Sequence, residues 1–374
     1  MAMILTFLRR LISMVLSALI VWGSSVTGLW TQQLKSIKTI NQVTEDFYTM
    51  DYTYDYDIDE LLERGAGSTV GLVLYGLYNT LGEDAKNTIA GLSNNFGCTT
   101  FNSINSEGEY LFSRNYDYME SPGMLVWTHP ENGYASVSNV SLYFLLYSRE
   151  RGFLPEDEFT SMLTTLVPYI PVDGMNEKGL SIGVLELEKD PTFQITGRPA
   201  LTTTTMVRAV LDKAATVEEA IEIFNTYDMR DLYFDGCTYH YHVTDAYGKS
   251  VVIEYVDGEM SLVYPEEKPG AMTDYIAAAN YFLTEGVDDP LGLGYDRVET
   301  VYNALDKSKG LTSESEAMNI LEDASVRYLD MNGYICSTLW SVVYNTHDLT
   351  FDVCVNNDYD NVYSFSIDEP QVLK

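Results

Sequence analysis

The order of strand-like and helix-like segments limits the fold of this chain more than any other feature. Strands begin at Cys98, helical patterns with apolar residues three and four apart interrupt them, and strands return toward the C-terminus. The predicted strands are Thr99–Ile104, Tyr110–Ser113, Leu180–Leu187, Tyr239–Thr244, Ser250–Tyr255, Thr338–Tyr344, Phe351–Val355 and Val362–Ile367. The predicted helices are Thr204–Ala215, Val217–Asn225 and Asp296–Lys307. This order predicts an α+β fold with antiparallel sheets rather than a doubly wound parallel sheet.

The first two strands are predicted to form a hairpin around a turn at Ser106–Gly108. The second strand returns beside the first, so Arg114 and Asp117 come within reach of Cys98. A cationic neighbour stabilises a thiolate relative to a thiol, and a carboxylate can orient a reacting amine. Cys98 is therefore a candidate nucleophile. The alternatives are a cysteine that only packs and a plain ion pair between Arg114 and Asp117.

A histidine base is missing from the sequence around Cys98. The histidines are His129, His240, His242 and His347. A free α-amino group, with a pKa of about 7.7–8.0, is a suitable general base near neutral pH. Cys98 is therefore predicted to become an N-terminal residue by self-cleavage after Gly97. The uncleaved chain is then an inactive precursor, with Asn95, Phe96 and Gly97 in or beside the substrate pocket.

Composition and motifs argue against several other functions. The net charge of −33 repels nucleic acid, which binds through clustered Lys and Arg. No glycine-rich phosphate loop follows a predicted strand, so no nucleotide cofactor is expected. His240 and His242 would share one face of a strand, but no nearby Cys or His completes a metal site. The remaining cysteines, expected to be buried small apolar residues with disulfides as the alternative, are Cys237, Cys336 and Cys354.

The N-terminal residues have the pattern of a targeting segment. Arg9 and Arg10 precede an apolar run, Leu11–Trp22, which small residues follow. Residues 1–30 are predicted to be a signal peptide or a membrane anchor, with residues 11–23 as the tether in the second case. Either one directs the body of the protein to the cell surface or the exterior.

Two further segments are predicted. Residues 31–97 are expected to be a helical pro-segment that packs on the outside of the antiparallel sheets, with short helices at Gly71–Tyr78 and Asp84–Leu92. Residues 98–374 are expected to be the catalytic domain.

Several short motifs, in the same order and at the same separations, resemble those of a known family. They are Cys98, Arg114, Asp117, Asp173–Leu180, Asn280, Arg297 and Thr338–Ser341. From about residue 45 to the end, the chain resembles the linear amide C-N hydrolases of the N-terminal nucleophile class. These include bile salt (choloylglycine) hydrolase, penicillin V acylase, acid ceramidase and N-acylethanolamine amidase. The resemblance implies an αββα sandwich of two antiparallel sheets.

The resemblance also implies site residues beyond the hairpin. Asn280 matches an oxyanion-hole asparagine, and Arg297 matches a later family arginine. Glu186 stands where bile salt hydrolases have Asn and penicillin V acylases have Tyr, whereas the ceramidase and acylethanolamine amidase branch has a glutamate. The alternatives are a turn or cap residue for Asn280, a solvated helix-start arginine for Arg297 and a solvated strand residue for Glu186.

The expected function is hydrolysis of a linear amide carbon–nitrogen bond in a small N-acyl amide, without cofactor or metal. In related enzymes the freed pro-segment can stay bound. The alternatives are bile salt hydrolase or penicillin V acylase activity, acyl transfer to an amine, and a catalytically silent surface binding protein.

Overall fold

The computed structural model describes residues 35–68, 71, 97–119, 121–145, 147–149, 152–157, 160–231, 237–327, 329–331 and 334–371. The predicted targeting segment, residues 1–30, lies outside the described residues. So do Asn95 and Phe96, and the two short helices predicted within residues 71–92, apart from Gly71. Among the described residues, no helix has the length and apolar character needed to cross a bilayer.

The first of two large sheets has nine strands. Its neighbouring strands are antiparallel, except that β2 and β5 run parallel. In spatial order the strands are β1 (Asn41–Thr44), β2 (Phe47–Tyr52), β5 (Gly123–Thr128), β6 (Ser136–Ser141), β7 (Asp173–Asn176), β8 (Ser181–Leu187), β11 (Thr238–Thr244), β12 (Ser250–Val256) and β13 (Glu259–Val263).

The second sheet has seven antiparallel strands. They are β14 (Ala277–Ala278), β3 (Cys98–Ile104), β4 (Tyr110–Met119), β16 (Tyr334–Asn345), β17 (Thr350–Val355), β18 (Val362–Ser366) and β15 (Leu329–Met331), the last paired with β16. Two short strands, β9 (Ala200–Leu201) and β10 (Asp228–Met229), form a separate parallel pair.

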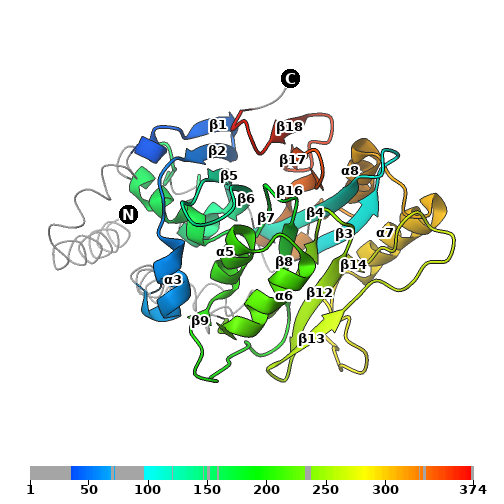
Figure 1. Ribbon diagram of the computed structural model, residues 1–374. Helices are drawn as coiled ribbons and strands as arrows, with labels where there is room; N and C mark the ends of the chain where they lie inside the picture. Colours follow the sequence, from blue (N-terminus) through cyan, green and yellow to red (C-terminus); the bar gives the residue numbers. More distant parts are fainter. Residues whose placement is uncertain are drawn as a thin grey trace.

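Helices cover the outer face of each sheet (Figure 1). On the first sheet, α5 (Thr203–Lys213) packs against β7 and β8, with α6 (Val217–Thr226) beside it. On the second sheet, α7 (Tyr295–Ser308) packs against β3 and β14, and α8 (Glu314–Asp323) against β4 and β16. The inner faces meet in one core, where the rings of Phe112 and His242 lie 5.1 Å apart. The predicted α+β class and αββα sandwich are confirmed.

Local capping explains where these helices begin. Ser313 accepts a hydrogen bond from the Glu316 N–H, and the Glu316 carboxylate accepts from the Ser313 N–H, which forms a capping box at the start of α8. Thr216 caps the Glu219 N–H at the start of α6. Each contact satisfies a main-chain donor that the helix itself leaves without a partner.

The described part of the predicted pro-segment, residues 35–68, is not the helical layer that the sequence predicts. Residues 35–68 contain the strands β1 and β2, and the α-helix α3 spans only Ile58–Arg64. Phe47 and Tyr48, on opposite faces of β2, are 1% and 0% exposed. Aromatic residues suit a strand that is covered on both faces. This segment is therefore part of the first sheet and not a helical layer outside it. The segment boundaries at residues 30 and 97 stay predictions.

Candidate active site

Cys98 is the first residue of β3 and is 5% exposed. In the predicted hairpin, β3 and β4 pair so that Cys98 lies opposite Tyr116 and Thr100 lies opposite Arg114. Strand β14 pairs with the other edge of β3 and leads directly to Asn280. The nucleophile candidate thus sits between the strand that carries Arg114 and Asp117 and the strand that leads to Asn280.

The Arg114 side chain extends from β4 in the second sheet toward the first sheet and passes beside the Cys98 thiol. Its Nη2 lies 3.6 Å from Cys98 Sγ and donates to the Val184 carbonyl at 2.5 Å, while Nη1 donates to the Val172 carbonyl at 2.6 Å. The side chain is fully buried. Gly183 makes this crossing possible, because a Cβ there would lie 2.8 Å from Arg114 Nη1. The guanidinium is therefore fixed as a positive charge beside the sulfur.

Asp173 supplies the negative charge that balances Arg114. Its Oδ2 lies 3.4 Å from Arg114 Nε and accepts from Trp340 Nε1 at 3.1 Å. Its Oδ1 accepts from Asn139 Nδ2 and from the Tyr344 hydroxyl, both at 2.7 Å. The sequence pattern places Asp173 at the start of a family motif and assigns it no role. No sequence signal joins these residues, which come from the four strands β4, β6, β7 and β16.

Asp117 and Arg297 form a second buried ion pair. Arg297 Nη1 donates to Asp117 Oδ2 at 2.7 Å, and the Thr338 hydroxyl donates to Asp117 Oδ1 at 2.5 Å. Burial raises the pKa of Asp117 to about 6, against the opposing effect of Arg297, Thr338 and Arg114. Asp117 is therefore mostly ionised at neutral pH. Two residues of the Thr338–Ser341 motif therefore face the site, because Thr338 contacts Asp117 and Trp340 contacts Asp173.

Asn280 holds the main-chain nitrogen of Cys98. Its Oδ1 accepts from Cys98 N at 2.6 Å and from Arg297 Nη2 at 3.0 Å, and its Nδ2 donates to the Glu186 carbonyl at 2.9 Å. Two donors face the oxygen and one acceptor faces the nitrogen, so all three contacts agree on the orientation of the amide. Nδ2 carries a second hydrogen beyond the one donated to Glu186. The oxyanion role stays a prediction, as do the catalytic roles of the other residues.

Glu186 reaches the site through its main chain. Its carbonyl accepts a hydrogen bond from Asn280. Burial holds the pKa of Tyr116 well above its ordinary value, and the charges of Cys98 and Glu186 add to this effect. All six predicted site residues therefore lie in one cluster: Cys98, Arg114, Asp117, Glu186, Asn280 and Arg297.

Arg297 lies directly against Gly97. A Cβ at Gly97 would come within 2.4 Å of Arg297 Nη1, so any other residue before Cys98 would displace this guanidinium from Asp117 and Asn280. Burial raises the pKa of the Cys98 thiol above its usual range, although Arg114 opposes this effect. In the uncleaved chain the thiolate is therefore scarce, and the Cys98 nitrogen is an amide rather than a base.

Other predicted or possible binding residues have different surroundings. His240 and His242 do share one face of β11, but Glu254, Ala279, Thr100 and Ser250 contact their ring nitrogens. Neither histidine is therefore placed to bind a metal. All four cysteines are free and buried.

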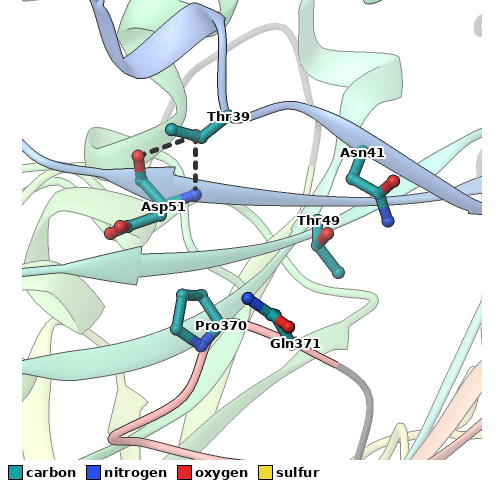
Figure 2. Close-up of a pocket in the computed structure, with 6 residues that line it drawn as sticks. All are labelled: Thr39, Asn41, Thr49, Asp51, Pro370 and Gln371. Atoms are coloured by element: carbon teal, nitrogen blue, oxygen red, sulfur yellow. Dashed lines mark hydrogen bonds between the residues drawn. The ribbon is translucent and has the colours of Figure 1, made fainter.

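Two surface features lie away from this cluster. Glu109, His347 and Asp348 are close enough to share a cation, but they lie beyond the turn end of the β3–β4 hairpin. A hollow of about 570 Å³ between β1, β2 and the C-terminal residues is shown in Figure 2. It is lined by Thr39, Asn41, Thr49, Asp51, Pro370 and Gln371. None of these residues belongs to the cluster around Cys98.

Comparison with known proteins points to one family for part of the chain. Residues 98–280 match the family model described as linear amide C-N hydrolases, choloylglycine hydrolase family. A penicillin V acylase of Pectobacterium atrosepticum is 34% identical over 96 residues, which is 23% of this chain and 26% of the acylase.

Solved structures show the same fold. A mutant conjugated bile acid hydrolase from Clostridium perfringens superposes with a TM-score of 0.51 at 15% identity, covering 74% of this chain and 95% of that one. A penicillin V acylase from Agrobacterium tumefaciens gives a TM-score of 0.51 at 20% identity, covering 73% and 87%. Residues 98–280 of this chain, 183 of its 374 residues, therefore match the linear amide C-N hydrolases of the choloylglycine hydrolase family.

Proposed function

We propose that this chain hydrolyses the amide bond of small N-acyl amides, and that Cys98 becomes its N-terminal nucleophile by self-cleavage after Gly97. The observation that carries the proposal is the 2.6 Å contact between Cys98 N and Asn280 Oδ1. Cleavage would turn this nitrogen into an α-amine beside Asn280, and Arg297 links Asn280 to Asp117. An amine in that position is a base next to the thiol.

Self-cleavage uses the same sulfur as turnover. Cys98 Sγ adds to the Gly97 carbonyl carbon, the peptide C–N bond breaks, and the thiol proton moves to the departing nitrogen. Water then hydrolyses the thioester, which leaves a Gly97 carboxylate and a Cys98 with a free amine and a free thiol. Contact with Arg297 on one side and with Asn280 on the other would hold the scissile bond still during this step.

Turnover follows the order of a covalent amidase. The α-amine takes the thiol proton, the thiolate adds to the substrate carbonyl, and the resulting ammonium protonates the leaving amine. Asn280 Nδ2 would donate to the oxyanion, and Arg114 would stabilise the thiolate. Water, activated by the α-amine, then releases the carboxylic acid and restores the thiol.

An apolar acyl group suits the surroundings of Cys98. Tyr116 lies opposite Cys98, and Tyr118 stacks on Tyr116 with ring centroids 5.7 Å apart. Tyr143 and Phe144, both half-buried, pack on Tyr118 at 5.3 and 6.2 Å. Glu186 stands where the bile salt hydrolases that this chain resembles have Asn, which supports a substrate other than a conjugated bile salt.

A penicillin V acylase activity is the second candidate, and the sequence match to such an enzyme favours it. Its substrate also joins an aromatic acyl group to an amine, which the same aromatic surface would accept. Acyl transfer to an added amine would use the same residues and differ only in the acceptor.

We further propose that the pro-segment stays bound after cleavage. Strand β2 pairs with β5 inside the first sheet, and the Tyr56 hydroxyl donates to both Asp212 carboxylate oxygens at 2.8 and 2.7 Å. At the surface, Lys213 Nζ donates to Asp59 Oδ1 at 2.8 Å. We also propose that the N-terminal apolar run carries the protein out of the cytoplasm or tethers it to the membrane.

The proposed function is tested with purified full-length protein and an N-acyl amide panel that includes penicillin V and a glycine-conjugated bile salt. The expected result is cleavage after Gly97 and release of carboxylic acid from an uncharged N-acyl amide or penicillin V, with Cys98→Ala inert. A wild-type chain that hydrolyses no amide in the panel would favour a binding protein. Release only from the bile salt would overturn the substrate class.

A further inference from the structure

The loop that carries Asn280 is attached to the first sheet on both sides of this residue. Before Asn280, the Ala279 carbonyl lies 2.7 Å from His240 Nε2. After it, the N–H groups of Leu283 and Thr284 donate to the Glu254 carboxylate at 2.8 and 2.9 Å, and the Thr284 hydroxyl donates at 2.6 Å. The position of Asn280 therefore depends on two side chains that do not touch Cys98 in any described contact.

These two side chains contact each other across neighbouring strands. His240 on β11 and Glu254 on β12 are fully buried, and His240 Nδ1 lies 3.0 Å from Glu254 Oε1. The imidazole is thus enclosed between a carboxylate and a main-chain carbonyl. Both of its nitrogens face acceptors.

The hydrogen bonds determine where the protons are. The Ala279 carbonyl can only accept, so His240 Nε2 carries a hydrogen. Glu254 already accepts three hydrogen bonds from Leu283 and Thr284, which favours its ionised form. Burial alone would raise the pKa of Glu254, but His240 and the donors of the loop hold it below the ordinary value. An ionised Glu254 requires a hydrogen on His240 Nδ1 as well.

We infer that His240 and Glu254 form a buried imidazolium–carboxylate pair that positions Asn280 against the Cys98 nitrogen. Both are positioning residues rather than catalytic ones. The inference rests on the proposed function for its kinetic consequence, but the protonation state of the pair does not depend on turnover. If His240 loses its Nδ1 proton, a lone pair faces the carboxylate and the link between β11 and β12 at this point becomes repulsive.

Several other titratable or charged groups lie near the pair of His240 and Glu254. On β11, burial and then the charge of His240 lower the pKa of His242 to about 3, so His242 is neutral. In the loop, burial raises the pKa of Tyr281 to about 12, and Asp289 accepts from the Phe282 N–H at 2.9 Å. On β8 the residue opposite His240 is the apolar Leu185. Beyond Asn280 lies Arg297, already paired with Asp117.

His242 provides a matched control. It is as buried as His240, lies two residues away on the same face of β11, and also has a partner at each nitrogen. Its partners are hydroxyls, which donate or accept, so a neutral imidazole satisfies both. Replacing His242 should reduce stability without affecting a proton that positions Asn280.

The first measurement is nitrogen NMR of histidine-labelled full-length Cys98→Ala protein near pH 7. We expect the His240 ring to carry hydrogens on both nitrogens. Its signal should disappear in His240→Gln and become that of a neutral ring in Glu254→Gln. In His242→Gln the signal of the doubly protonated ring should remain. A neutral His240 in the parent protein would overturn the inference, whatever the protein hydrolyses.

The second measurement is kcat and KM of the cleaved enzyme at one pH near neutrality. Misplacing a contact residue by about 1 Å costs on the order of 10²-fold in rate. Glu254→Gln and His240→Gln should lower kcat on that order with little change in KM. An equal loss of kcat in His242→Gln, or an unchanged kcat in Glu254→Gln, would contradict the positioning role.

Discussion

The main-chain nitrogen of Cys98 donates to Oδ1 of Asn280 at 2.6 Å, although 182 positions separate the two residues. This contact joins the first residue of β3 to the loop that follows β14. It brings the bond predicted to be cut and the residue predicted to bind the oxyanion into one cluster with Arg297 and Asp117.

The thiol of Cys98 is expected to be required for both cleavage and turnover. Cys98→Ala should remain full length and release no product, because no other group would attack the Gly97 carbonyl. Cys98→Ser should cleave slowly, since an alcohol is a weaker nucleophile than a thiol. Intact mass over time and product release measure the two effects. Normal turnover in Cys98→Ala would contradict the whole mechanism.

Asp173→Asn is expected to destabilise the fold as well as the site. It would leave Arg114 as a buried charge without its balancing carboxylate, which typically costs about 3–5 kcal/mol. Urea unfolding measures the loss. Glu218→Gln is the control, because it breaks an exposed pair with Lys249 and should cost about 0–1 kcal/mol. Equal stability of Asp173→Asn and the parent would show that Arg114 does not need this partner.

The stability of the uncleaved chain is expected to fall as the pH rises from about 4 to about 6. Burial raises the pKa of Asp117 from 3.8 to about 6, so the folded chain binds a proton more tightly than the unfolded chain in this window. The full contribution of Asp117 is about 3 kcal/mol. Unfolding of Cys98→Ala at several pH values tests this, and adding Asp117→Asn should reduce the slope, to which the similarly raised carboxyls of Asp212 and Asp231 also contribute. If the slope did not change, groups other than Asp117 would be responsible for the pH dependence of stability.

Tyr56→Phe is expected to weaken retention of the pro-segment after cleavage. The variant removes the donor to Asp212 and leaves this buried carboxylate with fewer hydrogen bonds, which costs about 1–3 kcal/mol. Size-exclusion chromatography of cleaved protein in mild denaturant should show earlier loss of the pro-segment than in the parent. Identical retention would mean that the strand β2 alone holds it.

Much of the fold follows from local pattern. The hairpin β3–β4, the strand β11 and the helix α5 lie within a few residues of their predicted positions, apart from the longer β4, because periodicity and turn residues act locally. Strands β5 and β6 were not predicted, because their residues are buried on both faces and show no simple alternation of exposure. The strand β2 was mistaken for part of a helical segment, since its parallel pairing with β5 is a long-range contact.

The residues of the site likewise divide into those that the local sequence predicts and those that it does not. Arg114 and Asp117 follow from the hairpin register, which sequence alone predicts. Asn280 and Arg297 were found only through the family motifs, because nothing local relates them to Cys98. The role of Asp173 and the pairing of His240 with Glu254 depend on contacts between strands and between sheets, which a single sequence does not reveal.

The most direct test of the central claim compares Gly97→Pro with the wild type by intact mass and by rate of N-acyl amide hydrolysis. Proline removes backbone freedom at the bond under attack, and its ring would displace the Arg297 guanidinium. The account predicts that wild-type protein yields a fragment beginning at Cys98 and is active, whereas Gly97→Pro stays full length and inactive. A full-length Gly97→Pro protein that hydrolyses the amide at the wild-type rate would contradict the α-amine as base.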